Sequence, residues 1–367
     1  MFRFLEILSM NHEIVFLAQG RTGERPEEEG RYLDSLKDLN IKTYVEEYSL
    51  AKILMASTFR AAILEFYYVA DHYIPRIRIL QPKCHVIVDT VDLHYRRAFS
   101  KYQMTGRPED LSAAEKTKRE ELDTYRKADG IVTVTDEDAE VLYADCPGLR
   151  VWTIPNIHEA ATARGRDGNR NLLFVGGFRH EPNVDAILYF YGEVFPRIRL
   201  AIPDCTFTIV GSDPPEEILE LQSESIHVTG FVPRLDPFFR SSYISVAPLR
   251  FGAGMKGKVG EAMAEGLPVV TTSIGAQGMG LVHRHDAMIC DSPSEFADSV
   301  VELFRDPGLY EIIRKNALEK IDGICGKAYV GKRVDEIMGQ LDDRRPHRLG
   351  FKEKMNIASN FLKKMFP

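Results

Sequence analysis

The sequence alternates along its whole length between short apolar runs rich in β-branched residues and longer stretches of helical character. Strands are predicted in the first half at 14–18, 42–48, 62–68, 85–90, 130–135 and 151–155. The second half repeats the pattern with NLLFVGG, CTFTIVGS, SIHVTGF, YISVAPL, LPVVTTS and AMICDS. Helices are predicted at 25–39, 113–128, 183–200, 215–221, 258–265, 293–305 and 307–321. This spacing indicates an α/β fold of two successive units, each a parallel sheet covered by helices on both faces.

The segment 156–171, NIHEAATARGRDGNRN, is polar and has no apolar period, so it is predicted to link the units. The predicted boundaries are an N-terminal domain at 1–157, a C-terminal domain at 158–342 and a tail at 343–367. Apolar residues at helical spacing and four lysines make this tail basic and amphipathic. It is predicted to dock on the protein or to lie on an anionic membrane surface.

Composition narrows the class of protein. The net charge of −7 argues against a nucleic-acid partner, and no apolar run approaches the roughly 20 residues that cross a bilayer. The 5 cysteines are odd in number and far apart, which fits neither a disulfide framework nor a zinc ribbon and suits a reducing compartment. We therefore expect a cytoplasmic protein, with peripheral contact at the inner membrane face through the tail as a second expectation.

A glycine motif in the second half carries the most chemistry. Gly252, Gly254 and Gly257 spell G-x-G-x-x-G between an apolar run and a helix-forming run. Strand, glycine loop and helix are the context of a dinucleotide fingerprint. An NAD site also needs an acidic residue at the tip of the next strand, but LPVVTT is followed by Ser273 and contains no acid.

The residues around this motif favour a different phosphate ligand. Lys256 and Lys258 place two ammonium groups beside a helix N-terminus, a site for dense negative charge such as a diphosphate. Glu261, one turn into the helix, can accept the two hydroxyls of a ribose. The motif therefore predicts a nucleoside diphosphate, with NAD as the weaker alternative.

The stretch APLRFGAGMKGKVGEAMAEGLPVVTTSIGAQG resembles the donor motif of the retaining group-one, family 4-like glycosyltransferases of the GT-B fold. NLLFVGGFRHEPNVDAI, FTIVGSDPP, IHVTGFVPRLDPFFRSSYISVAPL and VWTIPNIHE resemble the same family in order and spacing, over roughly residues 130–321. The resemblance implies two facing Rossmann-like domains with parallel sheets. It also implies transfer of a sugar, with retention, from a nucleoside-diphosphate sugar to a glycan or lipid-linked acceptor in cell-surface polysaccharide synthesis. No cofactor and no metal are implied.

The resemblance also assigns the donor site. Glu261 matches the second glutamate of the family's E-x7-E motif, and the first falls at Ala253, so backbone N–H groups would replace it at the sugar. The family's phosphate-binding Arg and Lys align with Gly177 and Pro182, which leaves other cations to substitute. The turn after the strand SIHVTGF matches the family's base-contacting turn. The implied donor-binding residues are Gly176, Gly177, Arg179, Gly230, Phe231, Val232, Arg250, Gly252, Ala253, Gly254, Met255, Lys256 and Glu261.

The predicted catalytic residues are His94, Lys256 and Lys258. His94 follows the strand 85–90 and matches a family histidine close to the transferred sugar; the alternative is a loop histidine that caps a helix. The two lysines would stabilise charge on the leaving diphosphate. Asp92 and His94 have no third ligand at a suitable spacing, so no metal site is predicted.

Four further residues keep two interpretations each. Asp89 and Asp92 are either a base toward the acceptor or helix caps. Asn183 is predicted to cap a helix, with a ligand contact as the weaker alternative. Arg97, beside a second arginine, either meets an anionic acceptor or is solvated.

The first ten residues, MFRFLEILSM, are predicted to form a helix that leads into the strand 14–18. In the resembled family a strand precedes this helix, so we expect an upstream start, a split gene or a truncated sequence. Two alternative functions remain. A GT-B nucleotide-sugar epimerase would need paired carboxylates, whereas a catalytically impaired nucleotide-binding or scaffold protein is suggested by Ala253 and the lost Arg/Lys pair.

Overall fold

The computed structural model describes residues 2–18, 26–45, 49–161, 169–341 and 346. The chain forms two compact units, and every ladder between its strands is parallel. The first unit contains the described parts of Met1–Val91, Lys116–Ile154 and Gly331–Pro367, and the second contains those of Asp92–Glu115 and Pro155–Val330. The predicted α/β class is confirmed. The predicted tail at 343–367, apart from residue 346, and the central part of the linker, 162–168, lie outside the described residues.

The first unit holds a two-stranded and a four-stranded sheet. Its strands are β1 (Val15–Ala18), β2 (Lys42–Val45), β3 (Ala61–Glu65), β4 (His85–Asp89), β5 (Gly130–Thr133) and β6 (Val151–Thr153). β1 pairs with β2, and the other four pair in the order β3-β4-β5-β6. Within the described residues, no ladder joins the two sheets.

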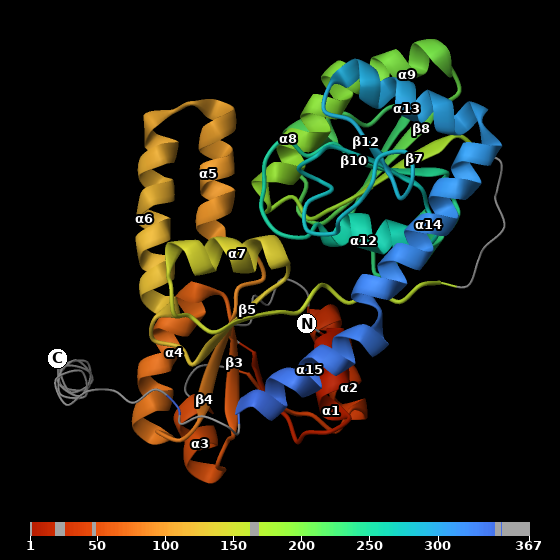
Figure 1. The fold of residues 1–367 in the computed structure, drawn as a ribbon. Helices are drawn as coiled ribbons and strands as arrows, with labels where there is room; N and C mark the ends of the chain where they lie inside the picture. Colours follow the sequence, from red (N-terminus) through yellow and green to blue (C-terminus); the bar gives the residue numbers. More distant parts are fainter. Residues whose placement is uncertain (1, 19–25, 46–48, 162–168, 342–345, 347–367) are drawn as a thin grey trace. The chain divides into compact units, whose positions relative to one another are not determined.

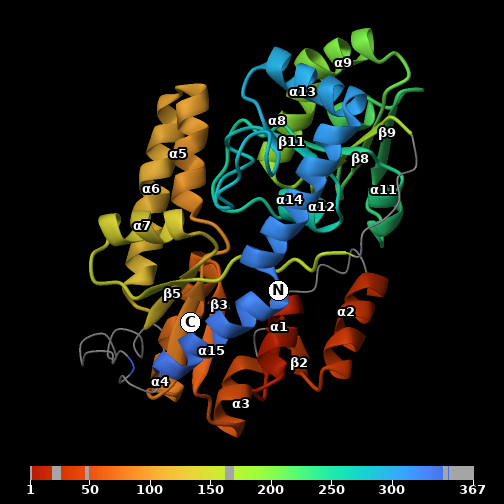
Figure 2. The same ribbon diagram turned by 45° about the vertical axis from the view of Figure 1, so that its right-hand side comes forward.

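The helices of this unit precede, connect or follow its strands. They are α1 (Phe2–Ser9), α2 (Pro26–Asp38), α3 (Ser49–Ala56), α4 (Tyr67–Leu80), α6 (Pro108–Tyr125), α7 (Asp136–Asp145) and α15 (Lys327–Leu341). The predicted N-terminal helix is confirmed, and Leu5 on it packs with Leu36 and Ile41. Figures 1 and 2 show α15 beside α1, where Asn11 Nδ2 lies 3.4 Å from Asp335 Oδ1. The strand expected ahead of α1 stays a prediction.

Two predicted boundaries in the first half are wrong. The strand predicted at 62–68 ends at Glu65, because Phe66 has a φ of +66° and α4 begins at Tyr67. The helix predicted at 113–128 begins earlier, at Pro108. Proline suits the first position of a helix, and Glu109 and Asp110 in the first turn complement the helix dipole.

The second unit is built on one six-stranded sheet. Its strands, in spatial order, are β12 (Met288–Ile289), β11 (Val269–Thr271), β10 (Ile244–Ala247), β7 (Asn171–Val175), β8 (Thr206–Val210) and β9 (Ile226–Gly230). Its helical segments are α5 (His94–Thr105), α8 (Glu181–Tyr189), a π-helix (Phe190–Val194), α9 (Phe195–Ala201), α10 (Glu216–Leu219), α11 (Asp236–Arg240), α12 (Gly257–Ala264), α13 (Pro293–Arg305) and α14 (Pro307–Cys325). Figure 1 shows α8, α9 and α13 on one face of this sheet and α12 and α14 on the other.

The helix predicted at 183–200 is interrupted in the structure. It divides into α8, the π-helix and α9. Pro196 at the start of α9 has no N–H for the regular i→i−4 bond, so one wider turn accommodates the break. The π-helix places Phe190 at the centre of an aromatic cluster, 4.8 Å from Phe207 and 5.8 Å from Phe296 between ring centroids. This core fixes the sheet whose strand ends carry the site.

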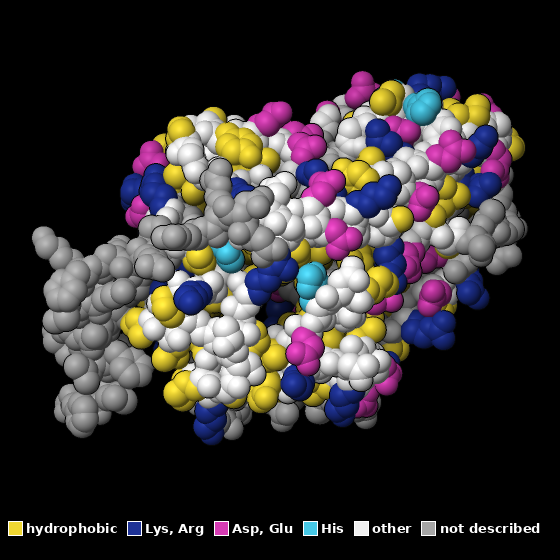
Figure 3. Space-filling model, turned by 60° about the horizontal axis from the view of Figure 1, so that its bottom comes forward, with side chains coloured by type: hydrophobic (Ala, Val, Ile, Leu, Met, Phe, Trp, Pro, Cys, Tyr) yellow, Lys and Arg dark blue, Asp and Glu magenta, His cyan; other side chains and the backbone are white. Residues whose placement is uncertain are grey.

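The surface charges, the cysteines and the hydropathy of the helices can each be compared with what the composition of the sequence predicts. Figure 3 shows acidic and basic side chains interspersed over one face of the molecule. All five cysteines are buried thiols. Among the described helices, none is both long enough and apolar enough to cross a membrane.

Candidate functional site

Glycines mark the carboxyl ends of the strands in the second unit. Gly176 follows β7, Gly211 follows β8, Gly230 ends β9, and Gly252 lies beyond β10. A Cβ atom on Gly211 would overlap the carbonyl oxygen of Gly176, so the turns after β7 and β8 approach each other at backbone distance. Ligands of open α/β sheets bind at this carboxyl edge.

The predicted strand, glycine loop and helix are confirmed at β10 and α12. Gly252 and Gly254 have φ angles of +149° and +67°, conformations that favour glycine. The N–H of Gly252 donates to Ser100 Oγ on α5 at 3.2 Å. Lys256 is the N-cap of α12, and its Nζ donates to the carbonyl oxygens of Ala253 at 3.0 Å and Gly254 at 2.6 Å. The loop therefore wraps around an ammonium group at the start of a helix.

Lys258, in the first turn of α12, is a half-buried cation. Its Nζ donates to Asn183 Oδ1 and lies 4.4 Å from the centre of the Phe174 ring. Burial, together with the charge of Lys256, lowers the pKa of Lys258 to about 7. No carboxylate among the described residues pairs with it, so the ammonium is charge-uncompensated.

Further basic residues face the same region. His180 is the N-cap of α8, and burial, followed by the charges of Arg97, Lys258 and Lys256, lowers its pKa to about 4. Arg97 belongs to α5, so positive charge reaches this place from α5 and α12. The sequence analysis did not select His180. The one sequence signal that could have identified His180 was its position directly before the helical segment that forms α8.

The two arginines expected at the diphosphate are engaged with acids. Arg179 is 63% exposed, and its Nε lies 3.0 Å from Asp213 Oδ2. Arg250 binds both carboxylate oxygens of Asp185, and its guanidinium lies 5.0 Å from the centre of the Tyr189 ring. These ion pairs reduce the charge available to a ligand, so a phosphate role for either arginine stays a prediction.

His94 is the first residue of α5, and the structure groups it with the second unit. Its Nδ1 lies 3.5 Å from Asp92 Oδ1, and Asp92 Oδ2 accepts from Arg97 at 2.6 Å. Burial lowers the pKa of His94. The imidazole is therefore neutral near neutral pH and can serve as a hydrogen-bonding group. Its catalytic role stays a prediction.

The remaining predicted residues lie on the same elements. Glu261 lies on α12, one turn beyond the glycine loop. Phe231 follows Gly230 and is 42% exposed at the carboxyl edge, and Val232 comes next. The Met255 side chain is buried, with its sulfur 3.8 Å from Cys325 Sγ, so only its backbone can meet a ligand.

The first unit holds an acid pair, half of which the sequence analysis missed. Glu65 ends β3 directly opposite Asp89 at the end of β4. Burial raises the pKa of both carboxyls, and Asp89 adds to the effect on Glu65. Phe66 and Val91, just beyond the two strands, have φ angles of +66° and +60°. The sequence analysis missed Glu65 because it predicted that the strand continues for three more residues, so Glu65 was not recognised as the end of a strand.

Replacing Asp89 by asparagine is expected to raise the melting temperature by a few degrees at pH 8. The raised pKa means that ionising Asp89 costs stability in the folded state, and an amide avoids that cost while still accepting from Val91 N–H. The gain should vanish near pH 4, where the folded wild type carries a protonated carboxyl. Thermal melts at both pH values test this, with the exposed Asp71→Asn as the control. A lower melting temperature at pH 8 would contradict it.

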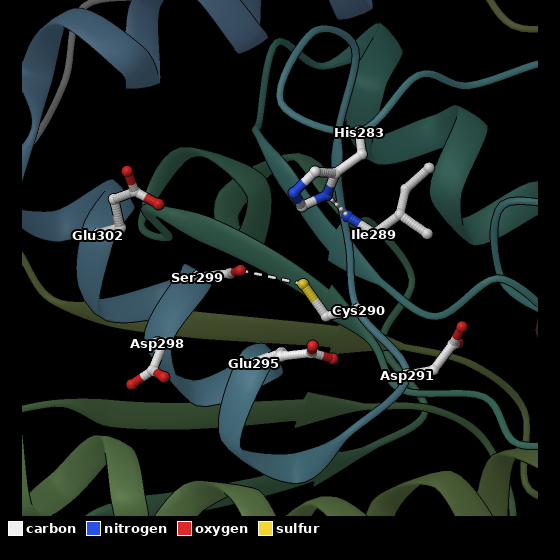
Figure 4. Close-up of a pocket in the computed structure, with 8 residues that line it drawn as sticks. All are labelled: His283, Ile289, Cys290, Asp291, Glu295, Asp298, Ser299 and Glu302. Carbon is white, nitrogen blue, oxygen red and sulfur yellow. Dashed lines mark hydrogen bonds between the residues drawn. The ribbon is translucent and has the colours of Figure 1, made fainter.

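A separate cavity of about 340 Å³ lies beside β12 and α13 (Figure 4). Its lining residues are His283, Ile289, Cys290, Asp291, Glu295, Asp298, Ser299 and Glu302. Several of its polar groups are already bonded: Asp291 accepts from Ser273, and Glu302 from Arg284. Within the described residues, no three acidic, histidine or cysteine side chains are placed to hold a metal ion. None of the predicted donor residues lines this cavity.

The two units have a known fold. Two α/β units with parallel sheets are the fold of GT-B glycosyltransferases. Anabaena HepE, crystallised with UDP and glucose, shares this fold at a TM-score of 0.68 and 12% identity, over 92% of this chain and 95% of that one.

A match to a known family lies in the second unit. Residues 169–306 match the family of glycosyl transferases group 1, which confirms the resemblance to group-one glycosyltransferases over this part of the chain. A 44.6 kDa protein in the cps region of Klebsiella pneumoniae is 28% identical over 154 residues, 39% of this chain and 40% of that protein. Glycogen synthase of Mycobacterium tuberculosis is 30% identical over 185 residues, 45% of this chain and 42% of the synthase. The chain thus spans less than half the length of these two relatives.

Proposed function

We propose that the protein is a glycosyltransferase that moves a sugar, with retention, from a nucleoside-diphosphate sugar to an acceptor hydroxyl. The observation that carries this proposal is the uncompensated ammonium of Lys258 beside Lys256, at the N-terminus of a helix and behind a glycine loop. A diphosphate supplies the negative charge that this arrangement lacks. HepE was crystallised with UDP, which makes a uridine donor the first choice.

The same geometry accounts for catalysis. Negative charge grows on the diphosphate as the bond to the anomeric carbon breaks. Ammonium groups fixed at that place stabilise the transition state more than the ground state, and this difference accelerates the reaction. The acceptor hydroxyl attacks on the face that the nucleotide leaves, and its proton passes to the departing phosphate oxygen. His94 would lie close to the transferred sugar.

The acceptor we propose is a glycan or lipid-linked sugar in the synthesis of a cell-surface polysaccharide. The match to glycogen synthase supports a polymeric sugar product. The lysines of the segment 343–367 support contact with an anionic membrane surface at the cytoplasmic face.

Thermal stabilisation by a panel of UDP, GDP, ADP, dTDP, NAD and NADP tests the donor site. A ligand at 100 times its dissociation constant adds about 2.7 kcal/mol to the folded state. This corresponds to roughly 5–10 °C for a domain of this size. We expect one nucleoside diphosphate to stabilise the wild type and Glu261→Ala to lose this effect, because the ribose contact is gone.

Glu265→Ala, at the C-cap of the same helix, is the matched control and should respond like the wild type. Stabilisation by NAD or NADP alone would assign the loop to a dinucleotide instead. No response to any nucleotide would overturn the proposed function.

A further inference from the structure

We propose that Asn183 is a positioning residue that keeps Lys258 free of a negative partner, so that binding of the donor's diphosphate is coupled to uptake of a proton by Lys258. This inference rests on the proposed function, because it requires an anionic donor at the glycine loop.

Asn183 joins the two turns that border the loop. It is 4% exposed in the first turn of α8, and its backbone N–H donates to the carbonyl of His180 at 2.9 Å. Its Nδ2 donates to the carbonyl oxygen of Gly177 at 2.6 Å, which directs Oδ1 toward the Nζ of Lys258. The interpretation from sequence, that Asn183 caps the helix, is wrong: His180 is the N-cap, and the Asn183 side chain bonds Gly177 and Lys258 instead.

The contact between Asn183 and Lys258 lies directly against the backbone of Gly176. A Cβ atom on Gly176 would lie 2.8 Å from Asn183 Nδ2 and 2.9 Å from Lys258 Nζ. The Phe174 ring occupies another side of the ammonium. Glycine at 176 thus leaves room for an amide and an ammonium, and the amide holds that ammonium in one place.

The chemistry of the amide matters as much as its position. An amide oxygen accepts a hydrogen bond without neutralising the donor, whereas a carboxylate there would form an ion pair. Lys256 is the charge that acts on Lys258. The neighbouring His180 is affected by Arg97, Lys258 and Lys256 and, in the opposite direction, by Glu181, whose carboxylate binds Lys101 at 2.8 Å. The charge that acts on Lys258 is therefore positive.

The lowered pKa of Lys258 predicts how many protons the protein takes up when the donor binds. Burial and Lys256 lower the pKa of Lys258 to about 7, so at pH 8 most of the ligand-free protein carries a neutral amine there. A diphosphate that enters reverses the local field and favours the ammonium. The uptake should approach one proton for each donor bound. His180 does not contribute, because its pKa of about 4 keeps it neutral.

Titration calorimetry with UDP-glucose, whose diphosphate diester keeps its charge between pH 7 and 9, measures this uptake. Buffers of different ionisation enthalpy give the number of protons bound. We expect net uptake at pH 8 and an affinity roughly 20-fold lower at pH 9 than at pH 7.5, as one linked proton with a free pKa of about 7 requires. Equal affinity at both pH values with no uptake would overturn the inference and leave the proposed function standing. If no nucleotide binds to the wild type, both the proposed function and this inference are refuted.

Three variants assign the effect to the pair. Asn183→Asp should hold Lys258 charged, lower the affinity at pH 7.5 by tenfold or more and abolish proton uptake. Lys258→Arg carries a permanent charge and should also abolish uptake, so it tests the coupling even if the Asp variant does not fold. Asn316→Asp on α14 makes the same change in net charge outside the contact and should retain uptake. An Asn183→Asp protein with the pH profile of the wild type would refute the role of Asn183.

Discussion

Replacing Lys258 by methionine is expected to lower turnover of the nucleotide sugar by about 10²–10³-fold, the usual cost of removing one preorganised electrostatic group. The methionine side chain can occupy the space of the lysine stem against Phe174 but brings no charge to the leaving diphosphate. Binding of the nucleotide should weaken as well.

The same substitution should not destabilise the fold. Folding lowers the pKa of Lys258 from its ordinary value of 10.5 to about 7, so the unfolded chain binds the extra proton between these values. Wild-type stability is therefore reduced progressively as the pH falls through this window, with the full cost below pH 7. The melting temperature of the variant should exceed that of the wild type by more at pH 6 than at pH 9.

Release of UDP from UDP-glucose and thermal melts at the two pH values measure these effects. Lys315→Met, at an exposed site on α14, is the matched control and should change neither. Turnover of Lys258→Met within a few-fold of the wild type would show that another cation stabilises the diphosphate.

Replacing Gly211 by alanine is expected to give the largest loss of stability, about 3 kcal/mol. Its new methyl group would overlap the carbonyl oxygen of Gly176, which is a backbone atom at the end of the adjacent strand and cannot rotate away. Moving it would pull β7 and β8 apart at the edge where the donor site lies. The melting temperature should fall by roughly 6–12 °C, and nucleotide stabilisation should disappear with it.

Gly192→Ala provides the comparison. An added Cβ meets no atom within 4 Å in the π-helix, and alanine restricts the unfolded chain, so this variant should be as stable as the wild type or more stable. Thermal melts of the two variants in parallel test the argument. If both substitutions had the same effect, the close approach of the two strand turns would be refuted.

Much of the fold could be predicted because its signals are local. Apolar runs and helical stretches identified the strands of both units, and G-x-G-x-x-G between a strand and a helix identified the loop. The predicted boundaries of strands and helices were wrong where the backbone conformation at one residue ends or interrupts the element. Nothing in the residues of β3 announces that Phe66 takes a φ of +66°, and nothing in the run 183–200 shows how the chain adapts to Pro196.

The site was predicted less completely, because charge partners depend on distant parts of the chain. Arg250 looked available for a phosphate, but the fold places it against Asp185. Glu65 and Asp89 became a pair only through the register of β3 and β4. Asn183 looked like a helix cap until the fold set its amide against Lys258.

The sequence by itself determined which groups this protein has for binding a diphosphate: a glycine loop, two lysines and a glutamate on one short segment. Local periodicity and the conformational freedom of glycine suffice for that, since neither depends on the rest of the chain. Only the tertiary structure decided which of the cations remains uncompensated. Desolvation and the choice of hydrogen-bond partner are properties of the packed neighbourhood, where residues 75 positions apart share one contact.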